Sequence, residues 1–143
     1  MADDLGFPNG TVVTPDGRTL IVGETFARRL TAFDIQDDGS LSNRRVWAQL
    51  DEGAPDGICL DAEGCIWIAS PREPAGYLRI AEGGEVKERI ELSDVSAYAC
   101  MLGGPEGRTL FLCEAVSGRP ADIQRGNGRI RSVDVDVPRA GLP

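Results

Sequence analysis

The chain has 143 residues, a net charge of −8, 18 glycines and 9 prolines, and 41% of its residues are apolar. The acidic balance argues against nucleic acid as a partner, because phosphate binding needs clustered Lys and Arg. There is no histidine, which excludes a Ser-His-Asp triad, a Cys-His dyad and an HExxH zinc site. No apolar stretch is long enough to span a bilayer, and the N-terminus lacks the features of a secretory signal, so we expect a cytoplasmic protein.

Three segments of the chain repeat one pattern of short strands and turns. Each has a four-residue apolar strand, a tight turn of Asp or Glu followed by Gly, and a second, more apolar strand. The first strands are predicted at Gly10–Val13, Gly57–Leu60 and Ala99–Leu102, and the second strands at Leu20–Val22, Ile66–Ala69 and Leu110–Cys113. The turn glycines Gly17, Gly64 and Gly107 lie 47 and then 43 residues apart. Periods of about 40–50 residues with short strands are typical of a β-propeller.

An outer pair of strands follows in the first two repeats. These pairs are predicted at Leu30–Ile35 with Asn43–Ala48, and at Tyr77–Ile80 with Glu85–Leu92. The third repeat has a long polar insert, Ser117–Gly126, then one strand at Arg129–Val137 and no fourth strand. The prediction is therefore an all-β single domain over residues 1–143: a partial β-propeller of about three antiparallel four-stranded blades, at about 8–50, 55–92 and 98–137, with an incomplete last blade. The alternative, an all-β sandwich, does not predict the same turn three times at one internal spacing.

Cysteines and tryptophans lie in apolar strands. The four cysteines (Cys59, Cys65, Cys100 and Cys113) form no CxxC pair, so we expect buried thiols and not disulfides or zinc ligands. Trp47 and Trp67 are predicted to belong to the core and not to a substrate platform.

Five sequence segments carry a resemblance to a known family. They are FPNGTVVTPDGRTLIV, LTAFDIQDDGSLSNRRVWAQL, PDGICLDAEGCIWIAS, ACMLGGPEGRTLFLC and GRIRSVDVDVP. With these the chain resembles the regucalcin, gluconolactonase and luciferin-regenerating-enzyme family. The resemblance implies a six-bladed propeller with a divalent metal on its axis that hydrolyses lactones or related esters. It also implies that this chain is the C-terminal half only, without the N-terminal blades that carry a further metal-binding Glu, another Asn and several substrate-binding side chains.

Two positions carry over from the metal site of that family. Asn9 matches a ligand Asn, and Asp56 matches a ligand Asp that also acts as the acid or base. Both precede the innermost strand of their repeat, so both should point to one axis, whereas the third repeat has Ala99 there. Amide and carboxylate oxygens favour Ca²⁺, Mg²⁺ or Mn²⁺ over Zn²⁺. The alternative is that Asn-Gly and Asp-Gly are ordinary turn dipeptides, as Asp16-Gly17 is.

The function predicted from these residues is metal-assisted hydrolysis of a small-molecule lactone, with Asp56 as general base and the substrate-binding residues unknown. We expect that a homodimer completes a six-bladed ring, with two copies of Asn9 and Asp56 around the axis. Two alternatives stay open: a truncated, inactive fragment, and a non-enzymatic propeller module that binds a metal or ligand. Weaker candidates near the channel mouth are Glu24, Arg72, Glu73, Tyr77 and Glu114.

Overall fold

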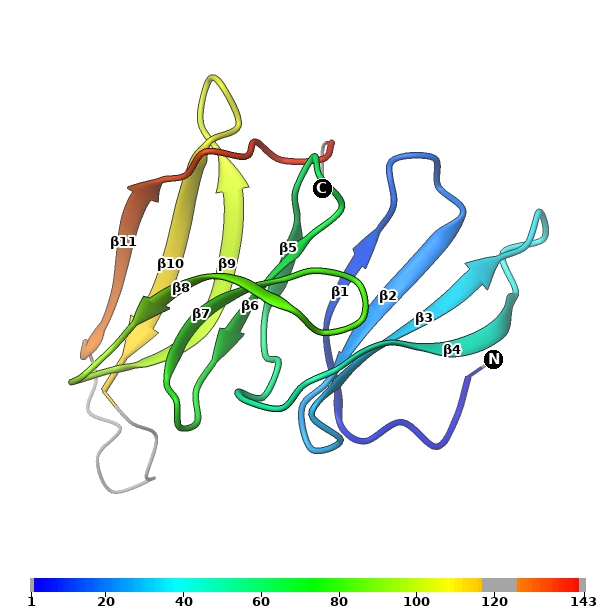
Figure 1. The fold of residues 1–143 in the computed structure, drawn as a ribbon, viewed down its shortest axis with the longest axis horizontal. Helices are drawn as coiled ribbons and strands as arrows, with labels where there is room; N and C mark the ends of the chain where they lie inside the picture. The colour runs from blue at the N-terminus through cyan, green and yellow to red at the C-terminus, as the bar shows by residue number, and fades with distance from the viewer. Residues whose placement is uncertain (1, 117–125, 142–143) are drawn as a thin grey trace.

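The computed structural model describes residues 2–116 and 126–141. Its regular elements are eleven β-strands in three antiparallel sheets (Figure 1). The first sheet has the order β1-β2-β3-β4, with β1 Pro8–Val13, β2 Thr19–Glu24, β3 Arg29–Ile35 and β4 Leu41–Gln49. The second has the order β5-β6-β7-β8, with β5 Ile58–Leu60, β6 Ile66–Ser70, β7 Gly76–Ile80 and β8 Val86–Glu91. The third contains β9 Ser96–Gly103, β10 Thr109–Ala115 and β11 Gly128–Asp134.

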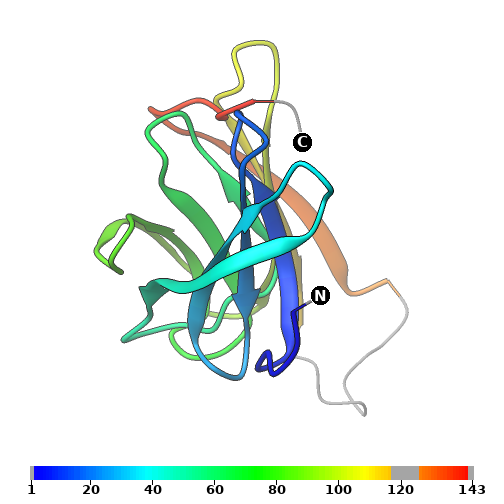
Figure 2. The same ribbon diagram turned by 90° about the vertical axis from the view of Figure 1, so that its right-hand side faces the viewer.

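The three sheets are consecutive meanders inclined to one another, as Figure 2 shows from the side. Their first strands, β1, β5 and β9, lie next to one another and begin at the same end of the molecule, the lower end in Figure 1. This is the blade arrangement of a propeller, with the first strand of each sheet innermost. The prediction of a partial propeller with an incomplete third blade is confirmed for the described residues.

Strand boundaries differ from the predicted ones where sequence polarity is misleading. The fourth strand of the first blade begins at Leu41, two residues before the predicted Asn43. The inner strand of the third blade runs from Ser96 and not from Ala99. Both extensions contain polar or small residues that gain ladder hydrogen bonds beside an already formed strand, a tertiary effect that overrides local propensity. The predicted insert Ser117–Gly126 lies almost wholly outside the described residues.

The core consists of two apolar layers, one on each side of the second blade. The layer toward the first blade includes Leu30, Trp47 and Ile68, and the layer toward the third includes Trp67 and Leu110. Because the second blade is covered on both faces, every residue of β6 and β7 is buried. The prediction that both tryptophans are core residues is confirmed.

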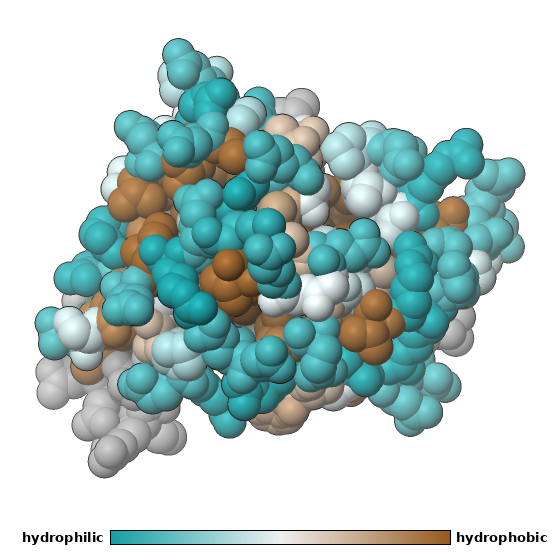
Figure 3. All heavy atoms as spheres, in the orientation of Figure 1, coloured by the Kyte–Doolittle hydropathy of each residue, from teal (hydrophilic) through white to brown (hydrophobic). Residues whose placement is uncertain are grey.

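The third blade leaves apolar side chains exposed on its far side. Met101, Phe111 and Ile130 are 43%, 39% and 73% exposed, and Phe111 lies directly opposite Met101 in the β9–β10 ladder. Figure 3 views the molecule from the side of the second blade, where the surface is mostly hydrophilic with scattered hydrophobic patches, and the far face of the third blade points away from the viewer. Scattered exposed apolar residues are common on monomers, but a row along one sheet face resembles the buried faces of the second blade.

The cysteines are thiols. All four are free; Cys59, Cys65 and Cys100 are buried, and Cys113 is partly exposed. The Sγ atoms of Cys59 and Cys100 lie 3.8 Å apart, a packing contact between the inner strands of the second and third blades. The expectation of buried thiols is thus confirmed for three of the four. No helix long and apolar enough to cross a membrane occurs in the part of the chain that the structure describes.

Candidate metal centre

Asn9 and Asp56 lie side by side where the inner strands of the first two blades begin. Asn9 is the second residue of β1, and Asp56 lies two residues before β5. The backbone N–H of Gly10 donates to the carbonyl oxygen of Asp56 over 2.9 Å, which joins the two strands at this level. The amide of Asn9 lies close enough to the Asp56 carboxylate to favour its ionised form. The structure therefore brings together the two residues that the sequence placed at one axis.

Two glycines allow the inner strands to approach this closely. A Cβ atom on Gly10 would lie 2.6 Å from the backbone nitrogen of Ile58, and one on Gly57 would lie 2.7 Å from the Cα atom of Ala99. Both neighbours are backbone atoms that cannot move aside easily. The glycine after Asn9 and the glycine after Asp56 are thus packing requirements of the inner strands and not tight turns, since neither has a positive φ.

The backbone of Asp56 is fixed on both sides. Its N–H donates to the carbonyl of Ala69 on β6, and its own carbonyl accepts from Gly10 on β1. Its side chain is half-buried, and this burial raises the pKa of the Asp56 carboxyl, an effect that the amide of Asn9 partly offsets. A half-buried carboxylate beside an amide is a feature that catalytic and metal sites share.

At this level the third blade has Tyr98 and Ala99 and neither an asparagine nor an aspartate. Gly57 donates its N–H to the carbonyl of Tyr98, whereas the equivalent bond from Gly10 goes to Asp56. A bulge in β9 between the partners of Cys113 and Glu114 shifts the register here. By this hydrogen bond the counterpart of Asp56 is Tyr98, one residue before the Ala99 given by sequence spacing, because spacing alone does not detect a bulge.

Glu24 is the last residue of β2 and Glu114 the last but one of β10, and both are buried in ion pairs. Glu24 accepts hydrogen bonds from Arg29, Thr31 and the backbone N–H of Gly6. Burial alone would raise the pKa of Glu24, but these hydrogen bonds outweigh it and lower the pKa to about 2. Glu114 pairs in the same way with Arg129 and Arg131 on β11. Each carboxylate is already paired with arginines of its own blade, so neither is free to bind a cation at the axis.

Glu24 also fixes the segment that leads to Asn9. Its Oε2 atom binds the N–H of Gly6 at 2.6 Å, and Phe26 donates its N–H to the carbonyl of Gly6. Phe7 has a φ of 63°, an unusual conformation for a bulky residue, and its ring stacks on that of Phe26 with centroids 4.6 Å apart. The buried carboxylate of Glu24 thus fixes the segment that precedes β1.

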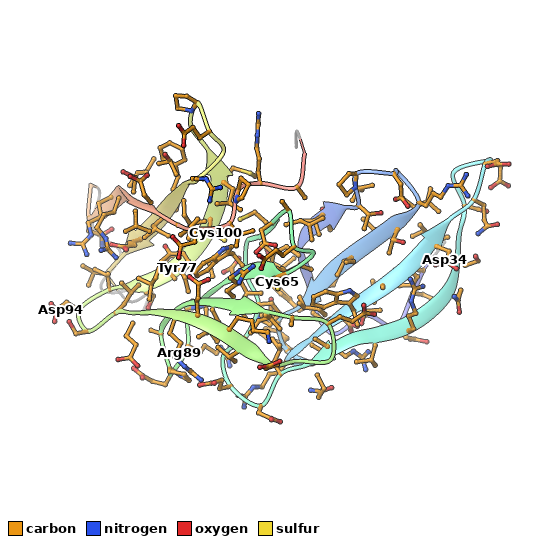
Figure 4. The ribbon with its side chains drawn as sticks, turned by 45° about the horizontal axis from the view of Figure 1, so that its top comes forward. Asp34, Cys65, Tyr77, Arg89, Asp94 and Cys100 are labelled. Atoms are coloured by element: carbon orange, nitrogen blue, oxygen red, sulfur yellow. The ribbon has the colours of Figure 1, made fainter. Side chains whose placement is uncertain are left out.

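The remaining weaker candidates have structural contacts. Tyr77 is fully buried and donates its hydroxyl to the carbonyl of Cys113 at 2.9 Å; Figure 4 shows it in the interior, near Cys100. Burial raises the pKa of Tyr77, so it is not an acid or base of this site. Arg72 is exposed and lies over the ring of Phe26, 5.4 Å from its centroid. Glu73 is exposed and precedes a cis proline.

The donor set at Asn9 and Asp56 suits a hard cation. It offers one amide and one carboxylate, both at the channel end of the inner strands, and such oxygens bind Ca²⁺, Mg²⁺ and Mn²⁺. Among the described residues no group of three or more His, Cys, Asp and Glu side chains is placed to hold a metal. The residues present therefore fit part of a coordination shell, since Ca²⁺ and Mg²⁺ take about six or more oxygens.

Comparison with known proteins decides the family. The model of the SMP-30/gluconolactonase/LRE-like region matches residues 1–116. The chain belongs to this family. It is 32% identical to regucalcin of Xenopus laevis over 127 residues, which are 86% of this chain and 42% of that protein. It is 29% identical to 6-deoxy-6-sulfogluconolactonase of Pseudomonas putida over 100% of this chain and 51% of that protein.

A solved gluconolactonase structure from Xanthomonas campestris is also similar. It is 34% identical and superimposes with a TM-score of 0.64, over 78% of this chain and 36% of that one. The chain thus spans about half or less of the length of these relatives. Two of these three relatives are lactonases by name. This chain corresponds to about half or less of each of them, and it contains Asn9 and Asp56.

Proposed function

We propose that this chain supplies half of a divalent-metal-dependent lactonase site, with Asn9 and Asp56 as metal ligands and Asp56 as general base. The observation that carries the proposal is that these two residues lie beside each other at the start of adjacent inner strands, which the hydrogen bond from the Gly10 N–H to the Asp56 carbonyl joins, with Asp56 half-buried. The gluconolactonase and sulfogluconolactonase relatives support an aldonolactone as the substrate class. Ligand type favours Ca²⁺, Mg²⁺ or Mn²⁺ over Zn²⁺.

Each residue has a defined task in this proposal. A divalent cation, when bound, would polarise the lactone carbonyl and lower the pKa of water. Asp56 accepts the proton of the attacking water, and its fixed backbone keeps the carboxylate in place between β1 and β6. Asn9 lies beside the same carboxylate and favours its ionised form, which is the form that accepts a proton. The lactone ring opens when the C–O bond of the acyl carbon breaks and the proton passes to the leaving alkoxide.

We propose further that a second copy of this chain completes the ring. The exposed row of Met101, Phe111 and Ile130 on the third blade supports this, because a following blade would cover it. Within the described residues β11 is paired on one side only, by β10. Two copies around a two-fold axis would bring two Asn9 and two Asp56 side chains together, which is four oxygen-bearing ligands and a better shell for one cation.

The test is aldonolactone hydrolysis by protein of known mass. The protein is stripped of metal with a chelator, its mass is measured by light scattering, and turnover is followed with Ca²⁺, Mg²⁺ or Mn²⁺ added back. Asp56→Asn should lower kcat by about 10²–10⁴-fold, the usual contribution of a general base. The matched control is Asp16→Asn, which changes another Asp before Gly, but in an exposed turn.

Three results would contradict parts of the proposal. A stable monomer at micromolar concentration would reject the ring of two copies. Metal binding without turnover in the assembled protein would favour a non-enzymatic binding module. Equal activity of Asp56→Asn and Asp16→Asn would reject the site itself.

A further inference from the structure

Thr25 connects the two candidate ligands through one hydroxyl group. It follows β2 directly and is 6% exposed. Its Oγ1 atom donates to the carbonyl of Pro55, the residue before Asp56, over 2.7 Å. The Nδ2 atom of Asn9 lies 3.4 Å from the same Oγ1 atom and donates to it. The buried hydroxyl of Thr25 thus contacts Asn9 itself and the residue that precedes Asp56.

The hydroxyl of Thr25 favours one orientation of the Asn9 amide. A threonine hydroxyl has one proton, and here Pro55 accepts it. The lone pairs that remain can accept a hydrogen bond from Asn9 but cannot donate one. If the amide were flipped, Oδ1 would face these lone pairs without a proton between them. The arrangement therefore favours Nδ2 toward Thr25, which is also the arrangement in which an N–H of Asn9 can reach the carboxylate of Asp56.

This orientation determines which atom of Asn9 is available for a ligand. With Nδ2 occupied, the amide presents Oδ1, and among the residues that the structure describes Oδ1 has no hydrogen-bond partner. Oδ1 is the atom that a cation binds, whereas Nδ2 repels it. Groups that orient a ligand without touching the metal commonly change metal affinity by about 10–100-fold.

We propose that Thr25 is a positioning residue that holds the Asn9 amide with Oδ1 toward the cation. The inference rests on the proposed metal function of Asn9 and Asp56. It goes beyond that function because Thr25 itself binds neither cation nor substrate. The competing explanation is that Thr25 only ties the end of β2 to Pro55 and so stabilises the fold.

Three variants separate these explanations. Thr25→Val keeps the shape and removes the hydroxyl, and Thr25→Ser keeps the hydroxyl and removes the methyl group. Thr31→Val is the matched control: Thr31 is also a buried threonine of the first blade, but its hydroxyl donates to Glu24 and not toward Asn9. Each valine variant loses the buried hydrogen bond that its hydroxyl donates, to Pro55 for Thr25 and to the charged carboxylate of Glu24 for Thr31, so a general loss of stability should affect Thr31→Val at least as much.

The first measurement is calorimetric titration of each protein with Ca²⁺ and with Mn²⁺ alone. Thr25→Val should bind about 10–100-fold more weakly than the wild type, and Thr25→Ser and Thr31→Val should stay close to it. The inference is overturned if Thr25→Val binds like the wild type, or if Thr31→Val weakens binding equally. A wild type that binds no cation would contradict the proposed function instead, so the two failures are distinguishable.

The second measurement needs no metal. In nitrogen-15 NMR spectra the side-chain NH₂ protons of Asn9 should show a nuclear Overhauser effect to residue 25, both in the wild type and in Thr25→Ser. In Thr25→Val the two NH₂ resonances should move toward the shifts of a free asparagine amide. Unchanged Asn9 resonances in Thr25→Val would show that the hydroxyl does not orient the amide, and would overturn the inference whatever the metal affinity.

Discussion

Replacing Glu24 by glutamine should destabilise the protein strongly at neutral pH and much less in acid. The pKa of Glu24 is lowered from 4.5 to about 2 by the hydrogen bonds that outweigh its burial. At about 1.4 kcal/mol for each pH unit, this corresponds to about 3 kcal/mol of stability at pH 7. Because the pKa of the folded state is depressed, the contribution is complete above 4.5 and is lost as the pH falls toward 2. Loss of one partner of a buried ion pair typically costs about the same.

Urea unfolding of the wild type and Glu24→Gln, from neutral pH down to about pH 3, measures this difference directly. The gap in unfolding free energy should be about 3 kcal/mol at pH 7 and should narrow below 4.5. The control Glu106→Gln, in an exposed turn, should show no gap at any pH. A gap for Glu24→Gln that does not change with pH, or one under about 1 kcal/mol, would refute the reasoning, since an exposed ion pair contributes no more than that.

Two further predictions concern packing between the blades. Gly57→Ala should cost about 1–3 kcal/mol in urea unfolding because its Cβ would lie 2.7 Å from the Cα atom of Ala99. Gly128→Ala, whose Cβ would make an ordinary contact at 3.6 Å, should cost much less, and equal losses would reject the packing argument. In the native protein a disulfide-exchange reagent should titrate Cys113 and reach the three buried thiols only on unfolding; rapid reaction of two or more thiols would contradict their burial.

Much of the fold could be predicted because the repeat is carried by local chemistry. The turn glycines Gly17, Gly64 and Gly107 all have positive φ, as their Asp or Glu-Gly dipeptides predict. The apolar runs after them are the second strands of the three blades, and that of the second blade, covered on both faces, is wholly buried. What spacing could not give is the bulge in β9, because an extra residue in one strand changes the register without changing the polarity pattern.

The candidate site was predictable to the extent that its residues share a position in the repeat. Asn9 and Asp56 each precede a glycine, and those glycines allow the inner strands to bring the two side chains together. Thr25 follows a different rule. Nothing local marks a threonine directly after β2, and its importance depends on a partner that lies far along the chain, Pro55. A sequence pattern finds ligands that repeat, whereas the residues that orient them become visible only when hydrogen-bond donors and acceptors are matched in space. For this reason the substitution of Thr25, rather than that of a further acidic residue, is the strongest test of whether Asn9 is positioned to bind a cation.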